Sequence, residues 1–163
     1  MELQTYDLKD LLITALKAET EAAKVYRDLA SRVENAMLKD KLGFLASEEE
    51  KHRGYFEVQF RQDFPGQDPC LPAKTAVPLP EVTLAGEDTP LSRVLEQAMA
   101  AEQAAYDFYR GLAGRYADEA TRNMIFYIAS MEMGHYRLLE IEKKNAEEFE
   151  AFNVSWPDIH VGP

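Results

Sequence analysis

The chain has 163 residues, of which 46% are hydrophobic and 29% are charged, and its formal net charge is −11. This composition is typical of a folded globular protein, and the length is sufficient for one domain with a substantial core. The acidic balance argues against nucleic acid or an anionic membrane as a partner, because both require basic surfaces. No apolar run approaches the ~18 residues of a membrane span, and no secretory leader is recognisable, so a cytoplasmic location is expected.

The first half of the chain predicts two helices. The first is expected to begin after Asp7 and to reach about Val33, and the second to follow a short break near Glu34 to Ala36 and to reach about Gln62. Both carry apolar residues at helical spacing, and charged residues interrupt each stripe: Glu19 in the first, and Glu49 and His52 in the second. Because charge is almost never buried without a partner, these side chains predict a counter-charge in the core.

A segment rich in proline and glycine follows at residues 61–90 and cannot be one continuous helix. We interpret it as a crossover over residues 63–89, with an irregular strap favoured over a short extended piece at residues 77–84. Thr89 is the expected N-cap of a third helix, with Pro90 at its first position. A fourth helix is expected from about Asp118 to about Glu150, followed by a tail over residues 151–163 that includes Trp156 and His160.

The second half of the chain repeats the first at an offset of 83 residues. Residues 15–56 and 98–139 are identical at 13 of 42 positions, against roughly two or three expected from composition. Glu19 is repeated as Glu102, and the Glu49-x-x-His52 motif is repeated at Glu132 and His135. The sequence therefore predicts an all-α fold of two duplicated helical hairpins, at about residues 7–62 and 90–150, in a single domain over residues 1–163.

This repeat brings six candidate metal ligands to the core: Glu19, Glu49, His52, Glu102, Glu132 and His135. Four carboxylates and two neutral imidazoles carry four negative charges, which two divalent cations would cancel. Carboxylate oxygens mixed with imidazole suit iron or manganese, while zinc remains possible. Other glutamates, at positions 21, 48 and 50, fall outside the stripes and are expected to face solvent.

The arrangement resembles the ferritin-like di-iron carboxylate proteins, in which two helices give one Glu each and two give Glu-x-x-His. Within that superfamily the chain is most similar to the rubrerythrins, on Glu19-x-x-Ala22-x-x-x-Tyr26, its copy Glu102-x-x-Ala105-x-x-x-Tyr109, and the two Glu-x-x-His motifs. The resemblance implies a ferritin-like four-helix bundle and two iron ions. For at least one of Tyr26 and Tyr109 it implies a hydrogen bond to a ligating carboxylate, and for each an ordinary core role is the alternative.

The resemblance also implies a function, an oxidoreductase that reduces hydrogen peroxide or dioxygen in the response to oxidative stress. Rubrerythrins usually carry another glutamate where this chain has Ala105, and commonly a four-cysteine rubredoxin domain that Cys70 alone cannot form. Electrons would then come from a separate donor such as a rubredoxin, and a homodimer is expected by the same resemblance. The alternatives are a ferroxidase or iron-storage protein and a metal-binding module without catalysis.

Overall fold

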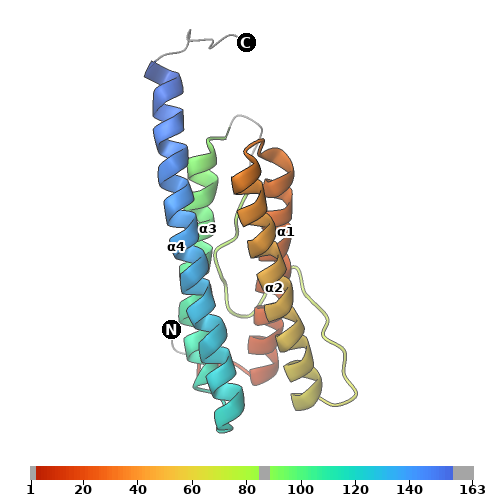
Figure 1. The fold of residues 1–163 in the computed structure, drawn as a ribbon. Helices are drawn as coiled ribbons and strands as arrows, with labels where there is room; N and C mark the ends of the chain where they lie inside the picture. Colours follow the sequence, from red (N-terminus) through yellow and green to blue (C-terminus); the bar gives the residue numbers. More distant parts are fainter. Residues whose placement is uncertain (1–2, 85–88, 156–163) are drawn as a thin grey trace.

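The computed structural model describes residues 3–84 and 89–155 and contains four long helices (Figure 1). Their bounds are Leu8–Arg32 for α1, Ala36–Asp63 for α2, Leu91–Ala113 for α3 and Glu119–Ser155 for α4. These four helices are the ones that the hydrophobic periodicity predicts. The helices α1 and α2 end within one residue of the predicted positions, and α4 continues five residues beyond its predicted end.

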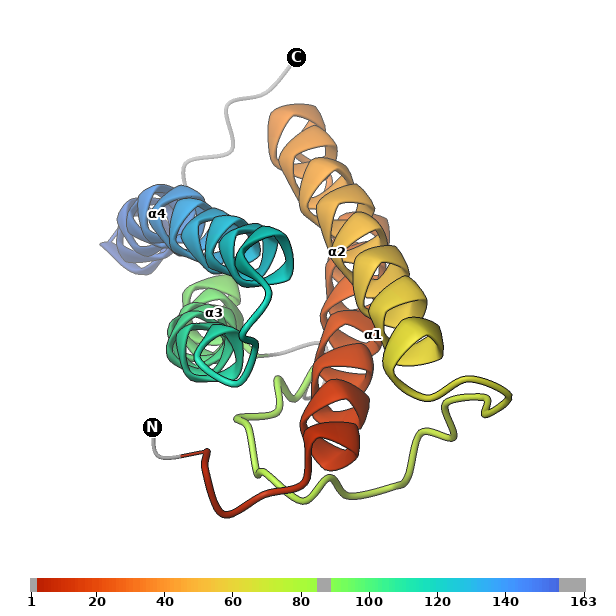
Figure 2. The same ribbon diagram turned by 90° about the horizontal axis from the view of Figure 1, so that it is seen from below.

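The helices form two antiparallel hairpins, as the sequence repeat predicts. The most extensive contacts are between α1 and α2 and between α3 and α4. The hairpins then face each other through the pairs α1–α3 and α2–α4 (Figure 2). Each hairpin therefore presents one face to the other, and the residues that interrupt the apolar stripes lie on those faces.

Side chains at the helix ends explain where the helices begin. The Asn35 side chain caps α2 by accepting a hydrogen bond from the backbone N–H of Leu38, 3.1 Å away. Asp118 accepts a bond of 2.7 Å from the N–H of Thr121 at the start of α4. The predicted cap of α3 was wrong by one residue, because Pro90 rather than Thr89 occupies the capping position and makes no side-chain cap bond.

The apolar stripes pack into two hydrophobic clusters, one toward each end of the bundle. The lower cluster in Figure 1 includes Leu12, Phe56, Phe60, Phe108, Leu112 and Ile125. The upper cluster includes Leu29, Leu42, Leu45, Leu95, Ala98 and Leu139. All twelve side chains are buried, at 3% exposure or less. The six charged residues of the stripes lie between these two clusters.

The crossover is an irregular strap over residues 64–84, without a strand in its described part. Val77 is buried in the lower cluster, and Val82 packs against the upper one. The predicted tail boundary at residue 151 was wrong, since α4 extends to Ser155. The predictions for Trp156 and His160 fall outside the described residues.

Candidate metal centre

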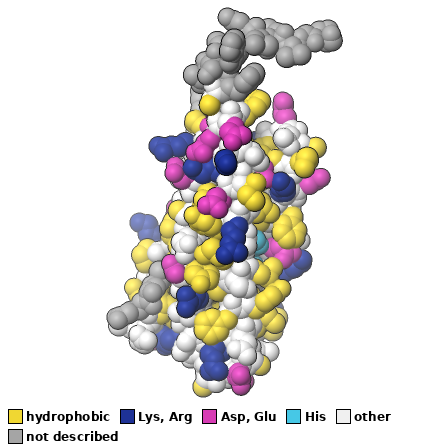
Figure 3. Space-filling model, turned by 60° about the vertical axis from the view of Figure 1, so that its left-hand side comes forward, with side chains coloured by type: hydrophobic (Ala, Val, Ile, Leu, Met, Phe, Trp, Pro, Cys, Tyr) yellow, Lys and Arg dark blue, Asp and Glu magenta, His cyan; other side chains and the backbone are white. Residues whose placement is uncertain are grey.

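The six predicted ligands converge at the centre of the bundle. Glu19 comes from α1, Glu49 and His52 from α2, Glu102 from α3, and Glu132 and His135 from α4. Each is at most 4% exposed. On the face that Figure 3 draws, only a small area of histidine is visible between hydrophobic and charged side chains. The burial of charge that the sequence predicts is thus present at all six positions.

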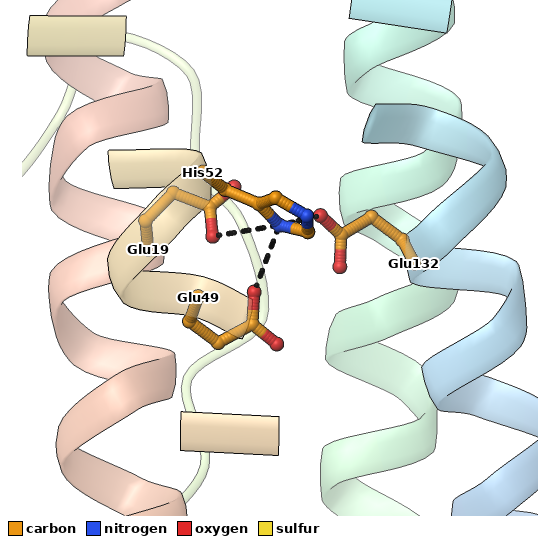
Figure 4. Close-up of side chains that lie close together, drawn as sticks. All are labelled: Glu19, Glu49, His52 and Glu132. Atoms are coloured by element: carbon orange, nitrogen blue, oxygen red, sulfur yellow. Dashed lines mark hydrogen bonds and ion pairs between the residues drawn. The ribbon is translucent and has the colours of Figure 1, made fainter. Parts of the chain in front are cut away.

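Glu49 and Glu132 each contact both imidazoles. His52 Nδ1 lies 2.9 Å from an oxygen of Glu132 and 3.2 Å from an oxygen of Glu49 (Figure 4). His135 Nδ1 lies 3.0 Å from Glu49 and 3.2 Å from Glu132. The distances around His52 nearly equal those around His135, as expected if a pseudo-twofold axis relates the two hairpins. The three-residue spacing within each motif places carboxylate and imidazole on one helix face.

The other two carboxylates each contact one imidazole only. Glu19 lies 3.6 Å from His52, and Glu102 lies 3.8 Å from His135. The six side chains therefore divide into two groups of four that share Glu49 and Glu132. Within each group, one potential ligand atom per residue lies within 4.8 Å of the others.

Two buried tyrosines join the hairpins at this level. The Tyr26 hydroxyl on α1 donates a hydrogen bond to Glu102 on α3, and the Tyr109 hydroxyl on α3 donates one to Glu19 on α1. Burial, together with the nearby carboxylates, raises the pKa of both phenols well above the usual value. Both hydroxyls therefore keep their protons and remain hydrogen-bond donors. The sequence left two interpretations for these tyrosines, a hydrogen bond to a carboxylate of the cluster or an ordinary core role. The structure shows the hydrogen bond for both.

Burial and neighbouring charged groups change the pKa values of several side chains in the cluster. Burial, and then the charges of neighbouring carboxylates, raises the pKa of Glu19 and of Glu102 well above the usual value. For Glu49, burial acts in the same direction, but the close contacts with the imidazoles of His135 and His52 outweigh it and lower the pKa to about 2. Burial would lower the pKa of His52, whereas its carboxylate partners raise it to about 12. The raised pKa values of Glu19, Glu102 and His52 therefore favour the protonated forms of these three groups when no metal is bound.

Comparison with known proteins assigns the chain to a family. The rubrerythrin family model matches residues 10–143, which is most of the chain. The chain belongs to the rubrerythrin family. No curated protein matches it.

Two solved structures resemble this rubrerythrin-family chain. A hypothetical protein from Pyrococcus furiosus is 30% identical, with a TM-score of 0.81 over 89% of this chain and 93% of that one. A protein from Thermotoga maritima, whose name describes it as ferritin-like and diiron-carboxylate, is 23% identical, with a TM-score of 0.72 over 85% and 95% of the two chains. The fold of this rubrerythrin-family chain is therefore a ferritin-like four-helix bundle.

The donor set fits a pair of metal ions. Four buried atoms of the cluster make no hydrogen bond of good geometry within the described residues: Glu49 Oε1, His52 Nε2, Glu132 Oε1 and His135 Nδ1. Glu49 Oε1 and His135 Nδ1 lie 3.0 Å apart, but not in hydrogen-bonding orientation. Leaving buried polar atoms unpaired is costly, and metal coordination would satisfy them. This member of the rubrerythrin family thus has a buried cluster of carboxylates and imidazoles that could hold two metal ions.

One sequence prediction near the site was wrong. Glu48 was expected to face solvent, but it is 7% exposed and pairs with Lys51 at 2.5 Å. The helical stripe is wide enough to cover the position beside Glu49, and the long lysine side chain supplies the counter-charge. Glu21 is exposed as predicted, and Glu50 is half-buried between Arg27 and Arg53.

Nothing in the described part of the chain has the form of a membrane span. None of its helices combines the length and the apolar character that crossing a bilayer requires.

Proposed function

We propose that this cluster binds two iron ions and that the loaded protein reduces hydrogen peroxide or dioxygen. The observation that carries the proposal is the division of six buried side chains into two groups sharing Glu49 and Glu132. A shared carboxylate can bridge two ions, and a paired site can supply two electrons to one oxidant. The family assignment supports the same chemistry.

Each residue has a role in this proposal. Glu19 and His52 would hold one ion, Glu102 and His135 the other, and Glu49 and Glu132 would lie between them. Four carboxylates match the charge of two divalent ions. Oxygen and imidazole ligands without thiolate suit iron or manganese, and zinc would bind without redox chemistry.

When bound, an iron pair supplies the two electrons that convert hydrogen peroxide and two protons into two water molecules. The chain provides the surroundings for this reaction. The two apolar clusters keep bulk water away on both sides along the bundle. Tyr26 and Tyr109 hold Glu102 and Glu19 by hydrogen bonds and thereby limit the positions of these carboxylates.

Two partners belong to this proposal. The donor would be an electron-transfer centre of rubredoxin type outside these 163 residues, whose single cysteine cannot build a four-cysteine iron site. The second partner is another copy of the chain. Exposed Tyr127 and Ile141 on α4, and Phe44 and Val58 on α2, support a homodimer. We place the protein in the cytoplasm, in a role against oxidative stress.

The proposal is tested by mixing the anaerobic ferrous protein with hydrogen peroxide in a stopped-flow spectrophotometer. We expect rapid oxidation, with one peroxide consumed per two iron ions. Glu132→Gln should slow this reaction strongly, whereas Glu140→Gln, an exposed change two turns further along α4, should match the parent. Ferrous protein that reacts with neither peroxide nor dioxygen would show that the catalytic proposal is wrong.

Turnover separates this function from its two alternatives. Supplied with reduced rubredoxin, a peroxide reductase consumes many equivalents of oxidant per protein, whereas a ferroxidase consumes oxidant only as ferrous iron is added. A storage protein would form a closed shell, which light scattering detects. A non-catalytic module would gain thermal stability from metal without turnover.

A further inference from the structure

A groove leads from the surface to the carboxylate cluster. It has a volume of about 760 Å³ and lies between α1, α3 and the part of the crossover from Lys74 to Leu84. Figure 2 shows this crossover passing along α1 and ending beside α3. The inner surface of the groove includes Glu19, Glu102 and both buried tyrosines. The groove is thus an approach to the proposed reaction site.

Between its charged rim and the carboxylate cluster, the groove has apolar side chains on both helices and on the crossover. Ala22 on α1 and Ala105 on α3 line it at positions related by the sequence repeat. Val25, Leu79 and Val82 add larger apolar surfaces. Alanine is the smallest side chain with a Cβ, so the space between the two helices remains available to a ligand at this level.

The roof of the groove is anchored on both sides of the opening. Val77 is 3% exposed within the lower cluster, and Val82 packs against the upper one. Between the upper anchor and α3, the backbone N–H of Thr83 donates a hydrogen bond of 2.9 Å to Gln97 Oε1. The crossover is therefore attached to the bundle at each end of the groove, so that a ligand would find a preformed site.

The charges around the groove do not favour an ionic ligand. Outside the cluster, its charged lining residues are four cations and three anions: Lys17, Lys24, Arg32 and Lys74 against Glu21, Asp28 and Glu81. Two of the lysines are already paired within α1, with Glu21 and Asp28. A nearly balanced rim gives little selection for either sign of charge.

The volume of the groove also exceeds what hydrogen peroxide needs. A water molecule takes about 30 Å³ in the liquid, and a peroxide has only one more oxygen atom. Pockets of roughly 300–1,000 Å³ with mostly apolar linings are those that bind organic ligands. The groove has the volume of such a pocket, and its apolar part could cover the apolar body of a ligand.

We propose that this groove binds the apolar body of a neutral organic hydroperoxide and directs its O–O group toward the carboxylate cluster. This inference rests on the proposed function and adds a substrate class to it. The O–O bond breaks, two electrons from the reduced metal pair and two protons are taken up, and an alcohol and water form. The rubredoxin-type donor returns the two electrons.

The binding site can be tested without turnover, using 2-phenylpropan-2-ol, the alcohol formed from cumene hydroperoxide. The full chain loaded with redox-inert zinc is titrated with this probe by calorimetry. We expect Ala22→Leu and Ala105→Leu to weaken binding at least about tenfold by filling the groove. Ala100→Leu, an exposed change on α3 outside the groove, should bind as the parent does.

A second measurement needs no substitution and guards against misfolded variants. With 13C-methyl alanine in the parent chain, the probe should shift the Ala22 and Ala105 methyl signals and leave that of Ala100 unchanged. No binding, or binding that leaves both groove methyls unperturbed, overturns the inference. Equal affinity of folded groove and control variants overturns it as well.

These outcomes are separable from failure of the proposed function. If the ferrous protein reacts with hydrogen peroxide but the probe does not bind, only the groove inference is wrong. If the probe binds at Ala22 and Ala105 but no hydroperoxide oxidises the ferrous protein, the ligand site stands and the reduction reaction is wrong.

Discussion

The hydrogen bonds between the two hairpins make a quantitative prediction about metal affinity. Tyr26→Phe removes one hydroxyl and keeps the buried ring, so it deletes the bond to Glu102 with little change in packing. The nearest imidazole to that carboxylate is then His135, 3.8 Å away, beyond hydrogen-bonding distance. Glu102 would have to ionise and bind metal without its donor.

The expected magnitude follows from the charge of the acceptor. A hydrogen bond to a charged group contributes about 1.5–3 kcal/mol, and each 1.4 kcal/mol is a factor of ten in a binding constant. Tyr26→Phe should therefore weaken binding at the ion held by Glu102 by about 10- to 150-fold. This agrees with the 10- to 100-fold loss that is typical when a group supporting a metal ligand is removed.

The assay is a competition titration of zinc or cobalt against a chromophoric chelator at constant pH. Tyr109→Phe should give a loss of similar size, because Tyr109 makes the symmetry-related bond to Glu19. Tyr127→Phe is the matched control, since that tyrosine is 59% exposed. If both buried variants bind metal within twofold of the control, the tyrosines do not support the ligands and the reasoning is refuted.

Three further predictions follow from the same geometry. Metal must displace protons from Glu19, whose pKa is raised by burial, and from His52, whose carboxylate partners raise its pKa to about 12 despite burial. The apparent affinity for metal should therefore rise with pH between about 6 and 8, and the protons released on metal binding can be measured in weak buffer. A metal affinity that does not depend on pH would contradict this prediction. Glu49→Gln should reduce zinc binding at both metal positions, whereas Glu19→Gln should reduce it mainly at one. Equilibrium dialysis measures the zinc bound per chain, and equal losses in the two variants would argue against shared coordination by Glu49. Phe56→Ala should destabilise the metal-free protein by about 3–5 kcal/mol in urea unfolding, since this fully buried ring belongs to the lower cluster; a loss below about 1 kcal/mol would contradict its core role.

The predictions that failed were local and have local reasons. The cap of α3 was displaced by one residue because Thr89 and Pro90 both suit a helix start, and sequence alone does not choose between adjacent registers. Glu48 was assigned to solvent because burial was inferred from a single stripe. Its contact with Lys51 shows that a flanking position can also be covered when a lysine on the same helix supplies the charge.

The sequence by itself determined the helices, their pairing into two repeated hairpins and the identity of the six converging side chains. These follow from periodicity and from the cost of burying charge, which are properties of single helices and their repeat. Only the tertiary structure decided which carboxylates are shared, that each tyrosine reaches the opposite hairpin, and that a groove beneath the crossover leads to Glu19 and Glu102. Those features depend on how far apart the two hairpins lie and on the path of an irregular segment, and no spacing within one helix encodes either distance.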